Sequence, residues 1–335
     1  MNVLVTGGGG FLGRVIVEQL VARGDRVRSF GRGRYPDLEA LGVEVVRGDI
    51  ADRDAVVRAC EGVEAVIHVA ALPGIAVKWA PYERANVVGT ENVLAGCRTH
   101  RISRLVYTSS PSITFAGVDQ CGVDESAPCD FRWMEANGAH YSRSKAIAEQ
   151  AVLAANDAAL RTCALRPHLI WGPRDNHLIP RLIARARSGR FRRVGDGTNR
   201  VDTIYVDNAA AAHLQALDAL AVESSHVAGR AYFLSQDDPV NCWEWIDEIL
   251  ALVDLPPVRK SISRPTAERV GAILERVYRA LSLSGEPPMS RFLAAQLATS
   301  HWFDISAARQ DFGYTPAIST AEGMRRLGEW LRRSP

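Results

Sequence analysis

A tyrosine and a lysine four residues apart, Tyr141 and Lys145, are the side chains in this sequence best suited to moving a proton. They lie in HYSRSKAIAEQAVLAAN, residues 140–156, which is typical of a helix, and their spacing puts both on one helix face. A phenol is a poor acid–base catalyst at neutral pH, but a neighbouring ammonium favours the phenolate and lowers its pKa. We therefore expect the pair to exchange a proton with a carbonyl oxygen.

Hydroxyl side chains from Thr108 to Ser110 end the apolar run RLVYTSS at residues 104–110. In an open parallel sheet the carboxyl ends of the strands face the ligand crevice. A hydroxyl group there can hydrogen-bond a substrate carbonyl. The alternative is that the serines only form a turn.

The elements that must position these side chains alternate between short apolar runs and helical segments. The expected strands lie at residues 2–6, 26–30, 43–49, 64–71 and 104–110, and the intervening helices include residues 52–60, capped by Asp52, and residues 83–98. This alternation predicts βαβ units and a doubly wound, parallel α/β sheet of the Rossmann type, covered by helices on both faces. We expect a dinucleotide-binding domain at residues 1–170, to which residues 200–235 return. Residues 171–199 and 236–335 should form a smaller, mostly helical substrate lobe.

A glycine-rich stretch, TGGGGFLG at residues 6–13, joins the first strand to the first helix. Glycines at such a turn let the backbone approach a pyrophosphate at the helix N-terminus. One register uses Gly8, Gly10 and Gly13, and the other uses Gly7, Gly10 and Gly13. The glycines alone do not choose between the two registers.

The end of the second strand indicates which dinucleotide is preferred. Enzymes that bind NAD place a carboxylate there, but this chain has Gly31 followed by Arg32 and Arg34. Guanidinium groups pair with a 2′-phosphate, so we expect NADPH or NADP+ rather than NADH, unless both arginines are only solvated. Asp49, after the third strand, either accepts from the adenine amino group or forms a cap or turn. Pro167, which ends a later apolar strand, is placed to lie beside the nicotinamide.

Composition excludes several other classes. The 335 residues carry a net charge of +2, which gives no reason to expect nucleic acid. Six cysteines without a C-x-x-C pair argue against disulfides and against a metal site, and they fit a reducing cytoplasm. No run reaches the roughly 18 apolar residues of a transmembrane segment, and the N-terminus lacks a signal-peptide pattern. We expect a cytoplasmic protein, in the form of a homodimer.

Together these motifs resemble the extended short-chain dehydrogenase/reductase family. The matching segments are TGGGGFLG, GD at 48–49, HVAA at 68–71, NVVGTENVL at 86–94, YTSS at 107–110, the Tyr141–Lys145 pair, RPHLIWGP at 166–173, YVDNAAAAHL at 205–214 and DFGYTP at 311–316. The resemblance selects Gly7, Gly10 and Gly13 and leaves Gly8 and Gly9 as filler. Val69 stands where the family usually has Asn, and Pro111 directly follows the serines.

Within that family the chain is similar to the 3β-hydroxysteroid dehydrogenase group. It is also similar to bacterial 2-alkyl-3-oxoalkanoate reductases of long-chain olefin biosynthesis, through FGRGRYPDLEALGVEVVRGDIAD at 30–52, VGDGTNRVDT at 194–203, GEPPMSRFLAAQL at 285–297 and SHWF at 300–303. The resemblance implies NADPH-dependent reduction of a long-chain 2-alkyl-3-oxo acid to the 3-hydroxy acid, and association with other olefin-pathway enzymes. The alternatives are a 3β-hydroxysteroid dehydrogenase, a nucleotide-sugar epimerase or dehydratase, and a non-catalytic NADP sensor.

The resemblance also implies roles for particular residues. Tyr141 would be the proton donor, Lys145 would bond the nicotinamide ribose and lower the tyrosine pKa, and Ser110 would polarise the ketone. The expected cofactor-binding residues are Gly7, Gly10, Phe11, Leu12, Gly13, Arg32, Arg34, Asp49, Ile50, Ala70, Thr108, Tyr141, Lys145, Pro167 and Ile170.

An amphipathic segment, residues 264–283, lies outside these motifs. Its apolar residues at helical spacing are Val270, Ile273, Leu274, Val277, Tyr278 and Leu281, and its other face carries Arg269, Glu275, Arg276 and Arg279. It is either an ordinary helix packed on the second lobe, an apolar lid over the substrate, a partner-binding face or an interfacial membrane helix. We favour the lid, because a lipid-like ketone needs a large apolar pocket.

Overall fold

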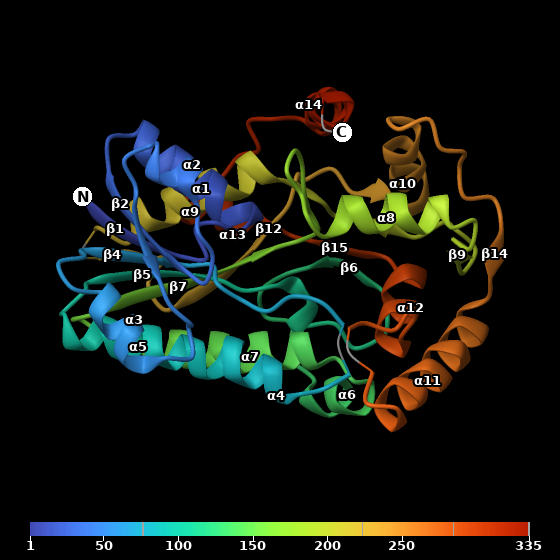
Figure 1. The fold of residues 1–335 in the computed structure, drawn as a ribbon, viewed down its shortest axis with the longest axis horizontal. Helices are drawn as coiled ribbons and strands as arrows, with labels where there is room; N and C mark the ends of the chain where they lie inside the picture. The colour runs from blue at the N-terminus through green and yellow to red at the C-terminus, as the bar shows by residue number, and fades with distance from the viewer. Residues whose placement is uncertain (76, 223, 284, 334–335) are drawn as a thin grey trace.

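The computed structural model describes residues 1–75, 77–222, 224–283 and 285–333, and a seven-stranded parallel sheet is its largest feature (Figure 1). The strands run in the order β12-β7-β5-β4-β1-β2-β3. Their bounds are β1 (Asn2–Thr6), β2 (Arg26–Gly31), β3 (Glu44–Arg47), β4 (Ala65–His68), β5 (Arg104–Thr108), β7 (Arg161–Pro167) and β12 (Arg230–Leu234). The strand order reverses beside β1, as in a doubly wound sheet, so the predicted Rossmann fold is confirmed.

Helices cover both faces of this sheet. One face carries α1 (Phe11–Ala22), α2 (Pro36–Glu39), α9 (Val206–Ala219) and α13 (Ser306–Phe312), and the other carries α3 (Arg53–Ala59), α5 (Gly89–Thr99) and α7 (His140–Ala154). Side chains alternate between these faces along β1: Val3 and Val5 pack into the core under α1 and α9, and Leu4 packs into the core under α3 and α5. The near-continuous apolar strands follow from this burial on both faces.

The helix α3 begins as the sequence predicts, whereas the segment before α5 has a different helix type from the one expected. The Asp52 carboxylate accepts from the Ala55 amide at 3.1 Å and caps α3, as predicted. The single helix expected at residues 83–98 begins instead as a π-helical segment, η1 (Glu83–Val88), before it continues as α5. A π-helical turn is closed by i→i+5 hydrogen bonds and occurs frequently at functional sites.

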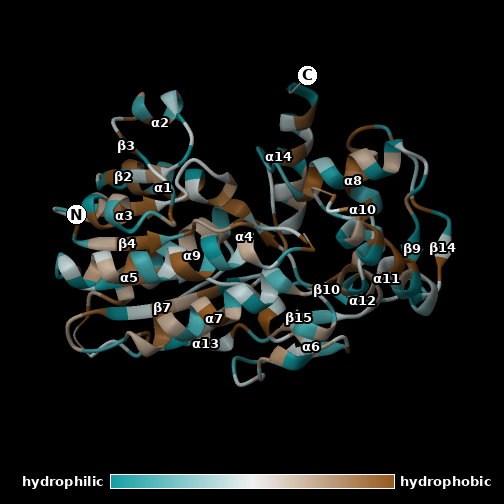
Figure 2. Ribbon diagram, turned by 60° about the horizontal axis from the view of Figure 1, so that its bottom comes forward, coloured by the Kyte–Doolittle hydropathy of each residue, from teal (hydrophilic) through white to brown (hydrophobic). Residues whose placement is uncertain are grey.

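Most of the remaining elements form a second part of the molecule, at the end away from the N-terminal strands (Figure 2). Its helices are α8 (Leu178–Arg187), α10 (Cys242–Ala251), α11 (Arg264–Ala280), α12 (Arg291–Ala298) and α14 (Thr320–Arg333). A four-stranded sheet has the order β13 (Val240–Asn241), β10 (Arg200–Val201), β15 (His301–Phe303) and β6 (Gln120–Val123). Two further sheets have two strands each. One pairs β8 (Ile170–Trp171) with β11 (Ile204–Tyr205), and the other pairs β9 (Arg193–Val194) with β14 (Ser261–Ile262). The short elements α4 (Ala80–Tyr82), η2 (Pro111–Ile113) and α6 (Phe131–Ala136) lie along the connections. Trp171, Trp243 and Trp245 are buried in the hydrophobic core of this part of the molecule.

Helix α11 forms where it was expected, but its large apolar side chains point to solvent and not into the protein. Its buried residues are Ala267, Gly271 and Glu275, whereas Val270 and Ile273 are exposed to solvent. The favoured prediction of an apolar lid is therefore wrong, because the apolar row covers no part of the large cavity described below. The helix turns its small residues inward because Gly271 lies against the backbone of Ser290.

Candidate active site

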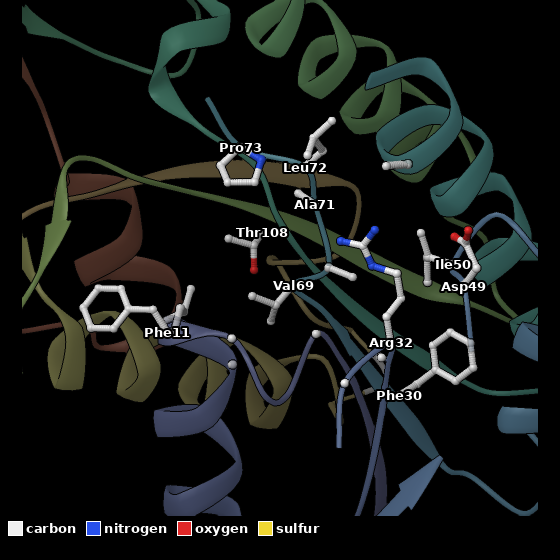
Figure 3. A pocket seen from close by; sticks show the side chains of 18 of the residues that line it. Phe11, Phe30, Arg32, Asp49, Ile50, Val69, Ala71, Leu72, Pro73 and Thr108 are labelled. Carbon is white, nitrogen blue, oxygen red and sulfur yellow. The ribbon is translucent and has the colours of Figure 1, made fainter. Parts of the chain in front are cut away.

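A cavity of about 650 Å³ lies at the carboxyl ends of β1 to β5 (Figure 3). The predicted site residues that line it are Gly7, Gly10, Phe11, Leu12, Gly13, Arg32, Asp49, Ile50, Ala70, Thr108, Tyr141 and Ile170. In this view Phe11 lies at one end of the cavity, and Asp49 and Ile50 lie at the other. Arg34, Ser110, Lys145 and Pro167 are not among the lining residues. The cavity thus brings the glycine turn and Tyr141 into one space.

At Gly7 and Gly13 of the glycine turn there is no room for a side chain. Gly7 has a positive φ of 72°, and a Cβ there would lie 2.9 Å from the Ala70 backbone. A Cβ on Gly13 would lie 2.2 Å from the Gly7 carbonyl oxygen. Gly10, the N-cap of α1, offers no side-chain acceptor, and the first turn of α1 has no carboxylate. The amide groups at this helix end can therefore hold an anionic pyrophosphate.

Gly8 and Gly9, which were expected to be filler, lie close to neighbouring side chains. A Cβ on Gly9 would lie 2.1 Å from the Tyr35 ring, and a Cβ on Gly8 would lie 2.5 Å from the Ser29 hydroxyl oxygen. A side chain at either position would require the Tyr35 ring or the Ser29 side chain to move. Tyr35 also lines the cavity, and sequence reasoning did not single it out.

The end of the cavity beside β2 and β3 combines two arginines with one carboxylate. Arg84 Nη2 lies 2.8 Å from Asp49 Oδ2, and the Ala51 amide donates to Asp49 Oδ1 at 3.0 Å. The hydrogen bond from the Ala51 amide lowers the pKa of Asp49, and the charges of Arg84 and Arg32 lower it further, against a smaller opposing effect of burial. Arg32 extends into the cavity, whereas Arg34 is exposed and lies outside it.

Arg84 is a lining residue that sequence reasoning missed. It lies in the π-helical segment η1, and a regular helix was expected there. Asp49 takes the turn role that was left open, since its Oδ1 accepts from an amide two residues later.

The Ser110 hydroxyl lies beside the phenol of Tyr141. Ser110 caps the short turn η2 that Pro111 begins, and its hydroxyl oxygen lies 2.9 Å from that of Ser112. Burial raises the pKa of Tyr141 to about 12, although a hydrogen bond with Ser110 opposes the shift. The expected lowering of the tyrosine pKa by Lys145 is therefore not found in this arrangement. The phenol of Tyr141 stays protonated at neutral pH.

Lys145 is buried behind the cavity wall, with 2% of its surface exposed. Its amino group donates to the backbone carbonyl of Thr108 and lies 4.2 Å from the centre of the Tyr107 ring. Burial lowers the pKa of Lys145 to about 7, and the negative charge of Glu149 opposes that shift. With this pKa, Lys145 occurs in both its protonated and its neutral form near neutral pH.

A buried ion pair fixes α7 against the sheet. Arg166 on β7 binds Glu149 through two contacts, Nη2 to Oε1 at 2.6 Å and Nε to Oε2 at 3.0 Å. Glu149 lies one helical turn beyond Lys145, so the same contacts hold the lysine in place. Sequence reasoning missed this pair because its members lie 17 residues apart on different elements.

Asn86 links the cavity wall to the start of α7. Its side-chain oxygen accepts from the Leu72 amide at 2.7 Å, and its side-chain nitrogen donates to the Ser144 hydroxyl at 2.8 Å. The Ser144 hydroxyl in turn donates to the Tyr141 carbonyl at 2.7 Å. This chain of hydrogen bonds orients the turn of α7 that carries the tyrosine.

Comparison with known proteins then decides the family. Residues 4–262 match the model of the "3-beta hydroxysteroid dehydrogenase/isomerase family". The chain belongs to this family. As a member of the 3-beta hydroxysteroid dehydrogenase/isomerase family it is an oxidoreductase related to the extended short-chain dehydrogenases.

Two relatives are similar to the chain over nearly its full length. The 2-alkyl-3-oxoalkanoate reductase of Stenotrophomonas maltophilia is 52% identical over 98% of this chain and 98% of its own length. The protein of the same name from Shewanella oneidensis is 47% identical over 97% of this chain and 85% of its own length. A sterol-4-alpha-carboxylate 3-dehydrogenase of Homo sapiens is 32% identical over 98% of this chain and 87% of its own length.

The fold is shared with more distant solved structures. The UDP-glucose 4-epimerase of Thermus thermophilus, solved in complex with NAD, superposes with a TM-score of 0.76 at 22% identity and covers 100% of both chains. Its low identity supports the fold alone. Among the described residues of the present chain, no cluster of His, Cys, Asp or Glu side chains is arranged to hold a metal. None of the described helices is long and apolar enough to span a membrane.

Proposed function

We propose that the protein reduces the 3-keto group of a long-chain 2-alkyl-3-oxoalkanoic acid to the 3-hydroxy acid with NADPH. The observation that carries this proposal is the 52% identity over 98% of both chains to a reductase of that name. The cavity adds independent support, because it joins a dinucleotide-type glycine turn to Tyr141.

The residues at the glycine turn and at Arg32 would hold the cofactor. The first-turn amides of α1 would bind the pyrophosphate, and Gly7 and Gly13 would let the backbone approach it. Arg32 would pair with the 2′-phosphate, which supports NADPH over NADH. Arg84 adds a second guanidinium group at the same end of the cavity. When bound, the nicotinamide supplies the hydride for C3 of the ketone.

Tyr141 would donate the proton to the ketone oxygen as the C–O double bond becomes an alcohol. Its pKa of about 12 keeps the phenol protonated at neutral pH, which suits reduction. The Ser110 hydroxyl, hydrogen-bonded to Tyr141, would donate to the same ketone oxygen and orient it. Lys145, when protonated, would stabilise the developing phenolate, and solvent would then restore the phenol.

Apolar side chains beside this end of the cavity would receive the alkyl chains. Leu72, Pro73, Pro81 and Ile170 line the same cavity as Tyr141. We assign residues 171–199 and 236–335 to substrate binding, and His177, which precedes α8 in the first of these segments, lines the cavity.

A substrate panel tests the proposal against its alternatives. The purified protein is given NADPH or NADH with a 2-alkyl-3-oxo acid, a 3-oxosteroid or a nucleotide sugar, and the products are identified by mass spectrometry. We expect NADPH-dependent formation of a 2-alkyl-3-hydroxy acid. Turnover of the steroid alone would favour a hydroxysteroid dehydrogenase, and conversion of the sugar alone would favour an epimerase; either result would refute the proposal.

A further inference from the structure

Helix α11 exposes a row of large apolar side chains that nothing in the proposed reaction uses. The exposed fractions are 40% for Val270, 58% for Ile273, 39% for Val277 and 67% for Leu281. At about 100° per residue, these four side chains fall within about 80° of the helix circumference. They therefore form one continuous stripe, and Leu283, after the helix end, is also 40% exposed.

The helix is held in this orientation by contacts on its other side. A Cβ on Gly271 would lie 2.5 Å from the Ser290 backbone, so α11 packs closely at that point. Glu275 accepts from the Arg291 amide at 2.7 Å and from Arg291 Nε at 2.9 Å. Rotating the apolar stripe inward would break this ion pair and force a larger side chain against the backbone. The exposure of the stripe is thus a fixed feature of the fold.

The charges around the stripe are cationic. Arg269, Arg276 and Arg279 are exposed, and Arg269 and Arg276 lie about 40° and 60° beyond one edge of the stripe on a helical wheel. The carboxylates of the same helix are neutralised, since Glu268 pairs with Arg264 and Glu275 with Arg291. An apolar stripe bordered by arginines is the pattern of a helix that lies in the interface of an anionic bilayer.

We propose that α11 binds the surface of an anionic lipid bilayer, with Val270, Ile273, Val277 and Leu281 entering the acyl boundary and the arginines contacting lipid headgroups. A stable contact with a second copy or a folded partner buries about 800 Å² on each side, which requires a broader face than one helical stripe. A bilayer needs only the stripe and its charges.

The position of α11 gives the bilayer contact a consequence for the cavity. Glu286, in the segment after α11, accepts from the Ile75 amide at 3.0 Å and pairs with Arg181 of α8 at 2.7 Å. Ile75 follows Leu72 and Pro73, which line the large cavity. The segment that follows α11 is thus tied to the loop that forms part of the cavity wall.

Co-sedimentation with vesicles tests the proposal without any turnover, so its outcome is separate from that of the proposed reaction. The full chain is mixed with vesicles of phosphatidylglycerol and phosphatidylcholine, and with vesicles of phosphatidylcholine alone. We expect binding to the anionic vesicles that is at least about tenfold tighter than to the neutral ones. A double variant, Ile273→Asp with Val277→Asp, should bind the anionic vesicles at least about tenfold more weakly.

Two further variants sharpen the test. Arg269→Gln with Arg276→Gln should lose the preference for anionic vesicles, and Val222→Asp, an exposed apolar residue outside α11, should bind like the unmodified chain. Thermal unfolding checks that every variant is folded. Absence of vesicle binding, or equal binding by the Asp double variant, would overturn the proposal. A lipid-free dimer that the Asp double variant converts to monomer would also overturn it, and would assign the stripe to self-association.

Discussion

Helices α7 and α11 each bury a glutamate that pairs with an arginine, but they differ in where their large apolar side chains lie. Helix α7 buries the charged side chains of Lys145 and Glu149 beneath the cavity, and α11 exposes Ile273 and Val277 to solvent. Both helices occur where the sequence predicted them. The difference lies in which groups have partners inside the protein.

The comparison teaches that paired charges and close backbone contacts set which face of a helix is buried. The Arg166–Glu149 pair orients α7, and the Arg291–Glu275 pair orients α11. Leaving a buried charge without its partner is more unfavourable than exposing an aliphatic side chain. Apolar periodicity alone therefore predicts a helix but does not determine its buried face.

The largest effect should come from the reactive end of α7. Tyr141→Phe removes the proton donor and should lower kcat by about 10²- to 10⁴-fold, because general acid catalysis contributes that much. Steady-state kinetics measure the rate, and fluorescence titration checks that NADPH still binds. Tyr278→Phe on α11 is the matched control and should keep the unmodified rate. Equal rates for Tyr141→Phe and the control would refute the proton-donor role.

The buried pair under α7 should matter most for stability. Glu149→Gln leaves the charge of Arg166 buried and unpaired, which should lower the free energy of unfolding by about 3–5 kcal/mol. Urea denaturation measures the change. Glu268→Gln on α11 breaks an ion pair that is far more exposed and should cost about 1 kcal/mol or less. Similar losses in the two variants would remove the distinction between the helices.

The cofactor end of the cavity should show a moderate effect. Arg32→Ser removes a guanidinium group from the cavity and should weaken NADPH binding by about tenfold or more, with little change for NADH. Arg34→Ser serves as the control, because Arg34 lies outside the cavity. Binding titrations with both cofactors measure the ratio. If Arg34→Ser alone changed that ratio, the 2′-phosphate would have to be assigned to Arg34.

The smallest effect should come from the exposed stripe. Ile273→Asp places a charge in solvent and should change the free energy of unfolding by about 0.5 kcal/mol or less. Ile246→Asp, on the buried face of α10, should destabilise by several times that amount. Denaturant titration compares them. A large loss from Ile273→Asp would mean that the stripe is packed in solution.

Much of the fold follows from local sequence signals. Apolar runs predicted the central strands, and Asp52 predicted the start of α3, because strand burial and helix capping depend on neighbouring residues. The spacing of Tyr141 and Lys145 predicted their common helix, and Thr108 and Ser110 ended the predicted strand near them. The roles of these residues in catalysis stay predictions.

The rest depends on contacts between segments far apart in the chain. Arg84 reaches the cavity through a π-helical turn, and Tyr35 folds back over Gly9, neither of which has a local signature. The tyrosine pKa was predicted from its lysine neighbour, but burial determines it. The buried face of α11 depends on Arg291, which belongs to the next helix.

The most direct test of the account is transfer of a labelled hydride. The protein is incubated with a 2-alkyl-3-oxo acid and NADPH carrying deuterium at C4, with each face of the nicotinamide labelled in turn, and the product is analysed by mass spectrometry. The account predicts a 3-hydroxy acid with one deuterium on C3 from one labelled face, and almost none of this product with Tyr141→Phe. A 3-hydroxy acid without deuterium from either face, or the same yield from Tyr141→Phe, would contradict it.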